Sequence, residues 1–211
     1  MVDYAKEKEA ISVSLMRKSD AYTIENFVSG KELMKRAAMG IYNSAEWDDK
    51  RIAIVCGSGN NGGDGYALAS ILADCGIFPT VFRVSEKFSE DGVFYYSQAK
   101  KKGVKDVVFT PGSCLSDFDM VVDCILGTGF RGCPEGVVAD VINTINNSGA
   151  YVISADINSG LDGDTGEAEL AVKSDLTVSI GYYKKGMFKN RAPEFIGKLI
   201  NVDIGIVLLS E

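Results

Sequence analysis

Short apolar runs that alternate with stretches of helical periodicity are the feature that most constrains the fold of this chain. Runs rich in valine and isoleucine, such as RIAIVC, DMVVDCI and AYVISADI, are separated by segments long enough to form crossover helices. Nearly continuous hydrophobicity is typical of strands buried on both faces, as in parallel sheets. The sequence therefore predicts an α/β fold: a three-layer, Rossmann-like sandwich with a mostly parallel sheet and helices on both faces.

The predicted elements leave no obvious linker. Two leading helices are predicted at residues 12–27 and 30–46, where apolar residues recur at helical spacing. A chain of 211 residues has the size of one α/β domain, so residues 1–211 are predicted to form a single domain. Strands are predicted at residues 51–56, 78–85, 106–109, 119–125, 150–157, 175–180 and 198–205, and further helices at 66–76, 88–102 and 135–147.

The composition argues against several classes of function. A formal net charge of −7 opposes binding to nucleic acid or to an anionic membrane, because long-range repulsion acts against both. No apolar run reaches the roughly 18–20 residues that span a bilayer. The opening MVDYAKEKEA also lacks the apolar stretch of a signal peptide. The five cysteines form no CxxC pair, which is typical of free thiols in a reducing compartment, so we expect a cytoplasmic protein.

The absence of histidine restricts the chemistry that the chain can perform. Ser-His and Cys-His nucleophile systems are excluded, and so are most catalytic zinc sites. Proton transfer therefore depends on Asp, Glu, Lys, Tyr, Cys or water. Cys56 and Cys124 are expected to be core thiols, since neither has a base to activate it.

Ligands of open parallel sheets bind at the carboxyl ends of the strands, so the loops after residues 56, 125 and 157 are candidate sites. The first, GSGNNGGDG, contains GxGxxG, which alone favours a dinucleotide-binding dehydrogenase. Asp64 argues against that reading, because a carboxylate in the first helical turn would repel a pyrophosphate held there. Asn60 and Asn61 add side-chain amides that a phosphate cradle does not require. The alternative is that these residues only shape a turn and cap a helix.

The second and third loops each follow an aspartate at the end of an apolar run. Asp123 lies in VVDCIL before a glycine-rich stretch, and Asp156 lies in ISADINSG before Ser159. Asp123 could merely cap or end its strand, but a carboxylate inside the apolar run VVDCIL needs a partner, either a cation or a basic or amide side chain. Asn61, Asp123 and Ser159 offer hard oxygen atoms with one formal charge, which suits a monovalent ion better than calcium.

Two downstream groups have ordinary structural interpretations. Lys184 and Lys185 follow another predicted strand, and such a pair either forms a solvated face or steers a phosphate. Asp162 and Asp164 are expected in an exposed turn and are assigned no chemistry.

Four segments together resemble, in order and spacing, the motifs of the NAD(P)H-hydrate epimerase family, the YjeF N-terminal domain. They are GSGNNGGDGYALA, VVDCILGTGFRG, ISADINSGLDGDTG and VKSDLTVSIGYYKKG. The leading ISVSLMRKSDAYTIENF is similar to the family's first helix, so the resemblance covers nearly the whole chain. It implies a Rossmann-like, usually homodimeric enzyme that interconverts the R and S epimers of NADHX and NADPHX, which are reduced cofactors hydrated at C6.

The resemblance also implies a site and a partner. One potassium ion per subunit would be held by Asn61, Asp123 and Ser159. The family often has proline where Asn158 stands, so the turn before Ser159 is expected to be less rigid. A separate NAD(P)HX dehydratase, which accepts only the S form, is the expected partner because no fused dehydratase domain follows. The implied substrate-binding residues are Asn60, Asn61, Gly62, Gly63, Asp64, Gly127, Thr128, Gly129, Phe130, Arg131, Gly132, Cys133 and Asp156.

The mechanistic hypothesis is acid–base exchange at C6. The lone pair of the ring nitrogen would expel the C6 hydroxyl, assisted by a proton donor, and water would return on either face of the planar product. Asp156 is the preferred acid–base group and Asp64 the second candidate. The main alternative is a non-catalytic YjeF-type ligand-binding or scaffold module, since a fold alone does not prove function. An oxidoreductase is the third hypothesis.

Overall fold

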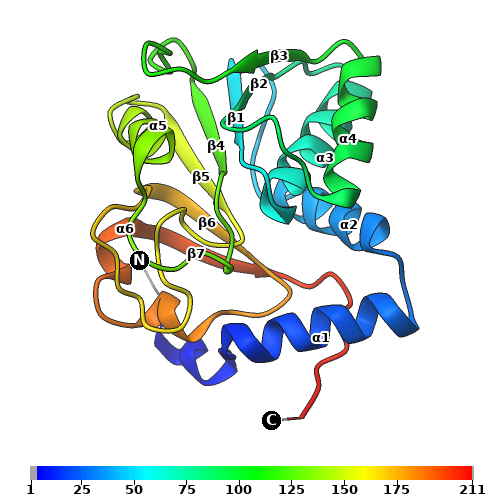
Figure 1. Ribbon diagram of the computed structural model, residues 1–211, viewed down its shortest axis with the longest axis vertical. Helices are drawn as coiled ribbons and strands as arrows, with labels where there is room; N and C mark the ends of the chain where they lie inside the picture. Colours follow the sequence, from blue (N-terminus) through cyan, green and yellow to red (C-terminus); the bar gives the residue numbers. More distant parts are fainter. Residues whose placement is uncertain (1–3, 211) are drawn as a thin grey trace.

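The computed structural model describes residues 4–210 and contains one sheet of seven parallel strands, in the order β3-β2-β1-β4-β5-β6-β7 (Figure 1). Every pair of neighbouring strands is parallel. The predicted α/β fold is therefore confirmed. The strands are β1 (Ile52–Cys56), β2 (Thr80–Arg83), β3 (Lys105–Val108), β4 (Met120–Cys124), β5 (Tyr151–Ala155), β6 (Ser174–Ile180) and β7 (Ile196–Val202).

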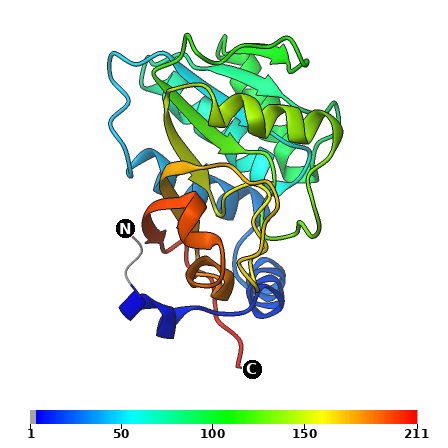
Figure 2. The same cartoon turned by 90° about the vertical axis from the view of Figure 1, so that its left-hand side faces the viewer.

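Helices cover both faces of this sheet. α2, α3 and α4 lie on one side, and Figure 2 shows α5 in front of the strands on the other side. α1, α2 and α4 begin after Ser12, Ser29 and Ser89, whose hydroxyls accept hydrogen bonds from backbone N–H groups of the first turn. The helices are η1 (Tyr4–Glu9), α1 (Val13–Asn26), α2 (Gly30–Tyr42), α3 (Asn60–Asp74), α4 (Glu90–Lys101), α5 (Gly136–Asn146), η2 (Lys185–Phe188) and α6 (Ala192–Phe195).

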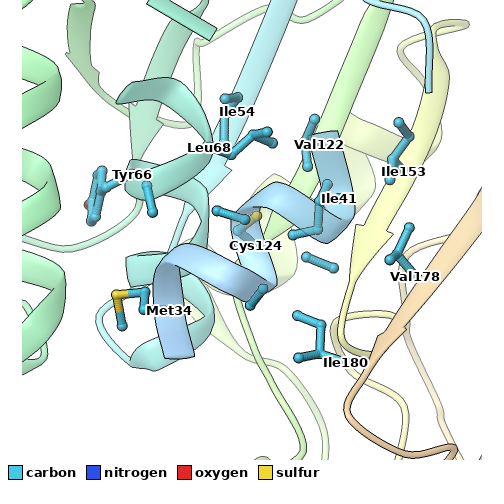
Figure 3. Packing of buried hydrophobic residues seen from close by; sticks show 14 of the residues in the cluster. Met34, Ile41, Ile54, Tyr66, Leu68, Val122, Cys124, Ile153, Val178 and Ile180 are labelled. Carbon is cyan, nitrogen blue, oxygen red and sulfur yellow. The ribbon is translucent and has the colours of Figure 1, made fainter. Parts of the chain in front are cut away.

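The continuous apolar runs arise because both faces of the central strands are buried. Ile54 of β1 packs with Val122 and other residues beneath α2 and α3 (Figure 3). The next residue, Val55, points to the opposite face and packs in the cluster that contains Ile142 of α5. Successive side chains of a strand alternate between faces, so each residue of β1 must be apolar.

The largest difference from the predicted elements is the start of α3. Most of the glycine- and asparagine-rich segment predicted as a loop is helical, because α3 begins at Asn60. A Cβ on Gly62 would lie 2.1 Å from the carbonyl oxygen of Gly57, and one on Gly65 would lie 2.7 Å from the Sγ atom of Cys56. Glycine therefore allows α3 to approach the sheet closely, which offsets its low helix propensity.

Smaller differences concern element boundaries near the chain's second half. β7 occupies residues 196–202 where 198–205 was predicted, and the short helices η2 and α6 occur where none was predicted.

The described cysteines are free thiols, and Cys56 and Cys124 are fully buried, which confirms their interpretation as core residues. None of the helices within residues 4–210 has the length and apolarity needed to cross a bilayer.

α1 lies across the end of the sheet and is held by segments distant in sequence (Figure 1). Just before it, Ile11 forms a bridge beside Lys184: its N–H donates to the Tyr183 carbonyl at 2.9 Å, and its carbonyl accepts from Lys185 at 3.0 Å. Near the other end of α1, the hydroxyl of Thr23 accepts a hydrogen bond from the Val207 N–H at 3.0 Å. These contacts fix the helix above the carboxyl ends of the strands.

Candidate functional site

A pocket of about 510 Å³ lies at the carboxyl ends of β1, β4 and β5 and is lined on its other side by residues of α1 and α2. The parallel topology brings these strand ends to one edge of the sheet, as predicted from the sequence. Its polar lining residues are Arg17, Asp20, Ser58, Asn60, Asn61, Asp64, Asp91, Thr128 and Asp156.

The structure brings most of the predicted substrate-binding residues to this pocket. Those that line it are Asn60, Asn61, Asp64, Gly127, Thr128, Gly129, Phe130 and Asp156. Within residues 4–210, five others are outside the lining. Gly62 and Gly63 face the protein interior, where a Cβ would meet Gly57 and Met34 respectively. Arg131, Gly132 and Cys133 are exposed beyond the end of the pocket.

Arg131 forms ion pairs with two aspartates outside the pocket lining. Its guanidinium pairs with Asp162 at 3.2 Å and with Asp164 at 2.8 Å. The other carboxylate oxygen of Asp164 accepts a hydrogen bond from the backbone N–H of Val13 at 2.7 Å. The two aspartates are therefore half-buried rather than exposed, which corrects that expectation, and they join the loop after β4 to the start of α1.

Asp123 is fully buried at the end of β4 and accepts hydrogen bonds on both carboxylate oxygens. Oδ1 accepts from the Ser159 hydroxyl at 2.5 Å and from the Ile125 N–H at 3.2 Å. Oδ2 accepts from the Ser154 hydroxyl and the Ser159 N–H, both at 2.9 Å. Burial raises the pKa of Asp123 above its ordinary value, and these hydrogen bonds oppose that rise.

The three predicted metal ligands meet around the backbone of Leu126. Its carbonyl oxygen accepts from the Asn61 side-chain amide at 3.0 Å and lies 3.2 Å from the Ser159 hydroxyl, which also contacts Asp123. The amide oxygen of Asn61 is buried and has no hydrogen-bond partner within residues 4–210. Such an oxygen is costly unless a donor or a cation satisfies it. The donor set is neutral oxygens with one carboxylate, and it fits a monovalent cation.

Asp156 follows β5 in the left-handed backbone region, with a φ of 66°. Its Oδ1 accepts a hydrogen bond from the Lys184 ammonium group. This group also donates to the Ile180 carbonyl at 2.9 Å and to the Ser179 hydroxyl at 3.3 Å. Lys184 is fully buried, so its interpretation as part of a solvated face is wrong. The local sequence gave no signal for this pair, because its two members are 28 residues apart.

Two further carboxylates lie near this ion pair. Burial, together with the negative charges of Asp156 and Asp20, raises the pKa of Asp64 well above its ordinary value, against the effect of Lys184. Burial and the charge of Asp156 likewise raise the pKa of Asp20. Sequence reasoning missed Asp20. The signal was its helical spacing from Met16 and Ile24, which places all three on the face of α1 that lines the pocket.

Asn158 replaces the proline that was expected to stiffen the turn before Ser159. Its amide nitrogen donates to the Val172 carbonyl at 2.9 Å and the Phe195 carbonyl at 3.0 Å. Its oxygen accepts from the Thr177 hydroxyl at 2.7 Å. The side chain is fully buried. These bonds hold the turn in place, so the expectation of a less rigid turn is not supported.

Comparisons with known proteins show the family to which the chain belongs. Residues 30–186 match the family described as YjeF-related protein N-terminus. An NAD(P)H-hydrate epimerase of Limosilactobacillus reuteri is 32% identical over 203 residues, covering 90% of this chain and 92% of that protein. The bifunctional NAD(P)H-hydrate repair enzyme Nnr of Coxiella burnetii is 31% identical over 196 residues, and this chain spans only 40% of its length.

A solved structure supports the fold independently. The crystal structure of the yeast protein ynu0, YNL200c, superposes with a TM-score of 0.71 at 21% identity, over 91% of this chain and 86% of that one. The family match covers more than half of the chain, and the predicted site segments from Asn60 to Ser159 lie inside it. This protein therefore belongs to the YjeF-related protein N-terminus family.

Proposed function

We propose that this protein is an NAD(P)H-hydrate epimerase that interconverts the R and S forms of NADHX and NADPHX. The observation that carries the proposal is the meeting of Asp64 and Asp156 at one pocket, where Asp156 is ion-paired with the buried Lys184, in a chain similar to named epimerases over most of its length. A homodimer in the cytoplasm, working with an NAD(P)HX dehydratase activity, is part of the proposal. Relatives named as bifunctional repair enzymes support the pairing of two activities.

The proposed reaction breaks and re-forms the C6–O bond of the hydrated ring. Asp64 gives its proton to the C6 hydroxyl while the ring nitrogen lone pair forms a C=N bond, and the hydroxyl leaves as water. Asp156, ion-paired with Lys184, stabilises the resulting iminium cation. Water then adds to either face, and Asp64 takes the proton back. The raised pKa of Asp64 supports its role as the donor, and the ion pair supports an anionic Asp156.

The proposal predicts that the protein accelerates equilibration of NADHX epimers. We expect a sample enriched in one epimer to approach the equilibrium ratio faster with protein than without it, at a pH where spontaneous epimerisation is slow. Chiral chromatography of timed samples measures the rate. Equal rates with and without protein would contradict the proposed epimerase activity. Binding of NADHX without catalysis would then favour the ligand-binding or scaffold alternative. Hydride transfer from NADH to a carbonyl compound would instead indicate an oxidoreductase.

We also propose that Asn61, Asp123 and Ser159, with the Leu126 carbonyl, hold one potassium ion. The unpartnered amide oxygen of Asn61 and the buried carboxylate of Asp123 support this assignment. When bound, the ion would supply a fixed positive charge beside the loops after β1, β4 and β5. The chain's own groups hold these loops together through the hydrogen bonds to Leu126.

Potassium is expected to stabilise the protein. At a concentration about tenfold above Kd, mass action gives about 1.4 kcal/mol, or about 3–6 °C in Tm for a chain of this size. Thermal unfolding in KCl and in tetramethylammonium chloride at equal ionic strength measures the difference. Asn61→Ala should abolish the difference, and Asn60→Ala, an exposed neighbour, should preserve it. Equal Tm values of the unmodified protein in the two salts would exclude the site.

A further inference from the structure

The charges that line the pocket are unusual for a site that receives a polyanion. Within residues 4–210, its lining includes four carboxylates, on Asp20, Asp64, Asp91 and Asp156, and a single cationic side chain, Arg17. Lys184 is nearby but is fully buried and engaged by Asp156. A dinucleotide carries two negative charges on its pyrophosphate, so it needs a local cation to enter such a pocket.

Arg17 is placed to meet such a ligand. It lies on α1 with an exposed side chain, and its guanidinium has no hydrogen bond or ion pair to any residue within 4–210. Its guanidinium lies directly over Gly129 of the loop after β4: a Cβ at Gly129 would be 2.8 Å from Nη2 and would meet no other group. The missing side chain at Gly129 thus leaves room for a planar group that presents several N–H donors to phosphate oxygens.

We propose that Arg17 binds the pyrophosphate of the dinucleotide substrate, an inference that rests on the proposed epimerase function. Arg17 and Asp20 are three residues apart, so their Cβ atoms are about 5–6 Å apart on the same face of α1. Asp20 is coupled electrostatically to Asp156 and Asp64, where the ring would react. Arg17 and Asp20 both line the pocket that also contains Asp64 and Asp156. The pyrophosphate is separated from the nicotinamide by one ribose, whereas the 2′-phosphate of NADPHX is farther along the molecule.

The test compares Arg17→Ala with Lys18→Ala, which removes an equal charge from the next residue of α1. Lys18 is exposed and is not part of the pocket lining. We expect Arg17→Ala to raise KM for NADHX and NADPHX equally, by about 10- to 100-fold, with kcat nearly unchanged. Arg17→Lys should recover part of the loss. Lys18→Ala should keep the KM of the unmodified protein.

A second variant tests the geometry without removing the charge. Gly129→Ala displaces only the flexible end of Arg17, so it should raise KM while the free energy of unfolding stays nearly constant. An unchanged KM in Arg17→Ala, or a rise confined to NADPHX, would overturn the assignment to the pyrophosphate.

A binding measurement separates this inference from the proposed function. Calorimetric titration with ADP-ribose, which carries the pyrophosphate but no nicotinamide, should show weaker binding to Arg17→Ala than to Lys18→Ala. Adenosine, which lacks phosphate, should not discriminate between the two variants. If the unmodified protein failed to epimerise NADHX but this difference in ADP-ribose binding remained, the reaction would be wrong and the phosphate contact right. If the unmodified protein epimerised NADHX but the two variants bound ADP-ribose equally well, only the assignment of Arg17 to the pyrophosphate would be rejected.

Discussion

Asp64→Asn is expected to lower kcat by about 10²–10⁴-fold, the usual contribution of a positioned proton donor, with little change in KM. The amide has nearly the shape of the carboxyl group but cannot release a proton to the C6 hydroxyl. Initial rates of epimerisation, followed by chiral chromatography, measure the effect. Asp74→Asn is the matched control, because Asp74 is an exposed residue at the other end of the same helix. If Asp64→Asn kept the full kcat, Asp64 would not be the proton donor, and Asp156 would be the remaining candidate.

Asp64→Asn should also stabilise the fold relative to the unmodified protein, and this gain in stability should be larger at higher pH. Burial and the charges of Asp156 and Asp20 raise the pKa of Asp64 well above the ordinary value of 3.8. The unfolded chain then ionises at lower pH than the folded one, so wild-type stability falls as pH rises through the folded pKa. Asparagine stays neutral at every pH. The free energy of unfolding of Asp64→Asn, measured in urea, should exceed that of the unmodified protein increasingly towards high pH, and a difference independent of pH would contradict this.

Lys184→Met is expected to destabilise the protein by about 3–5 kcal/mol, the usual cost of removing one partner of a buried ion pair. Lys184 is fully buried, and the side chain of Asp156 is only 18% exposed, so little water can replace the lost ammonium group. Urea unfolding measures the change. Lys189→Met, an exposed lysine in the same part of the chain, should have a small effect.

A double variant separates charge from packing. Lys184→Met combined with Asp156→Asn leaves no unpaired charge, and asparagine tolerates the left-handed backbone of residue 156. We expect this variant to regain most of the lost stability but to remain a poor epimerase, since no anion faces the iminium cation. If the double variant were as unstable as Lys184→Met, the effect would come from packing and not from the broken pair.

The parallel sheet and much of the pocket could be predicted because they depend on local patterns. Continuous apolar runs define β1, β4 and β5, and a parallel sheet brings their carboxyl ends together. This is why Asp64, Asp156 and Asn61 could be placed at one site before any coordinates were known. Their convergence follows from topology alone.

The start of α3, the burial of Lys184 and the position of α1 depend on contacts between distant segments. The glycines of α3 disfavour a helix by propensity, and only their close approach to β1 and β4 explains why the helix begins at Asn60. Lysine is rarely buried, so the sequence favours a solvated face for Lys184, whereas the structure buries it against Asp156. Arg17 and Asp20 reach the pocket because α1 crosses the sheet edge. Helical spacing groups Asp20 with Met16 and Ile24 on one face of α1, but it does not show where that face docks.

The bridge between Ile11 and Lys184 bears on the timing of assembly. A polypeptide made from its amino end exposes the helix that carries Arg17 long before the segment at 183–185 exists to hold it. The first five strands and their helices can associate during that interval. The start of α1, which forms one wall of the pocket, still lacks its backbone contacts with residues 183–185. A ribosome-bound chain therefore completes this wall of the pocket only after residues 183–185 have been made, although α1 was made much earlier.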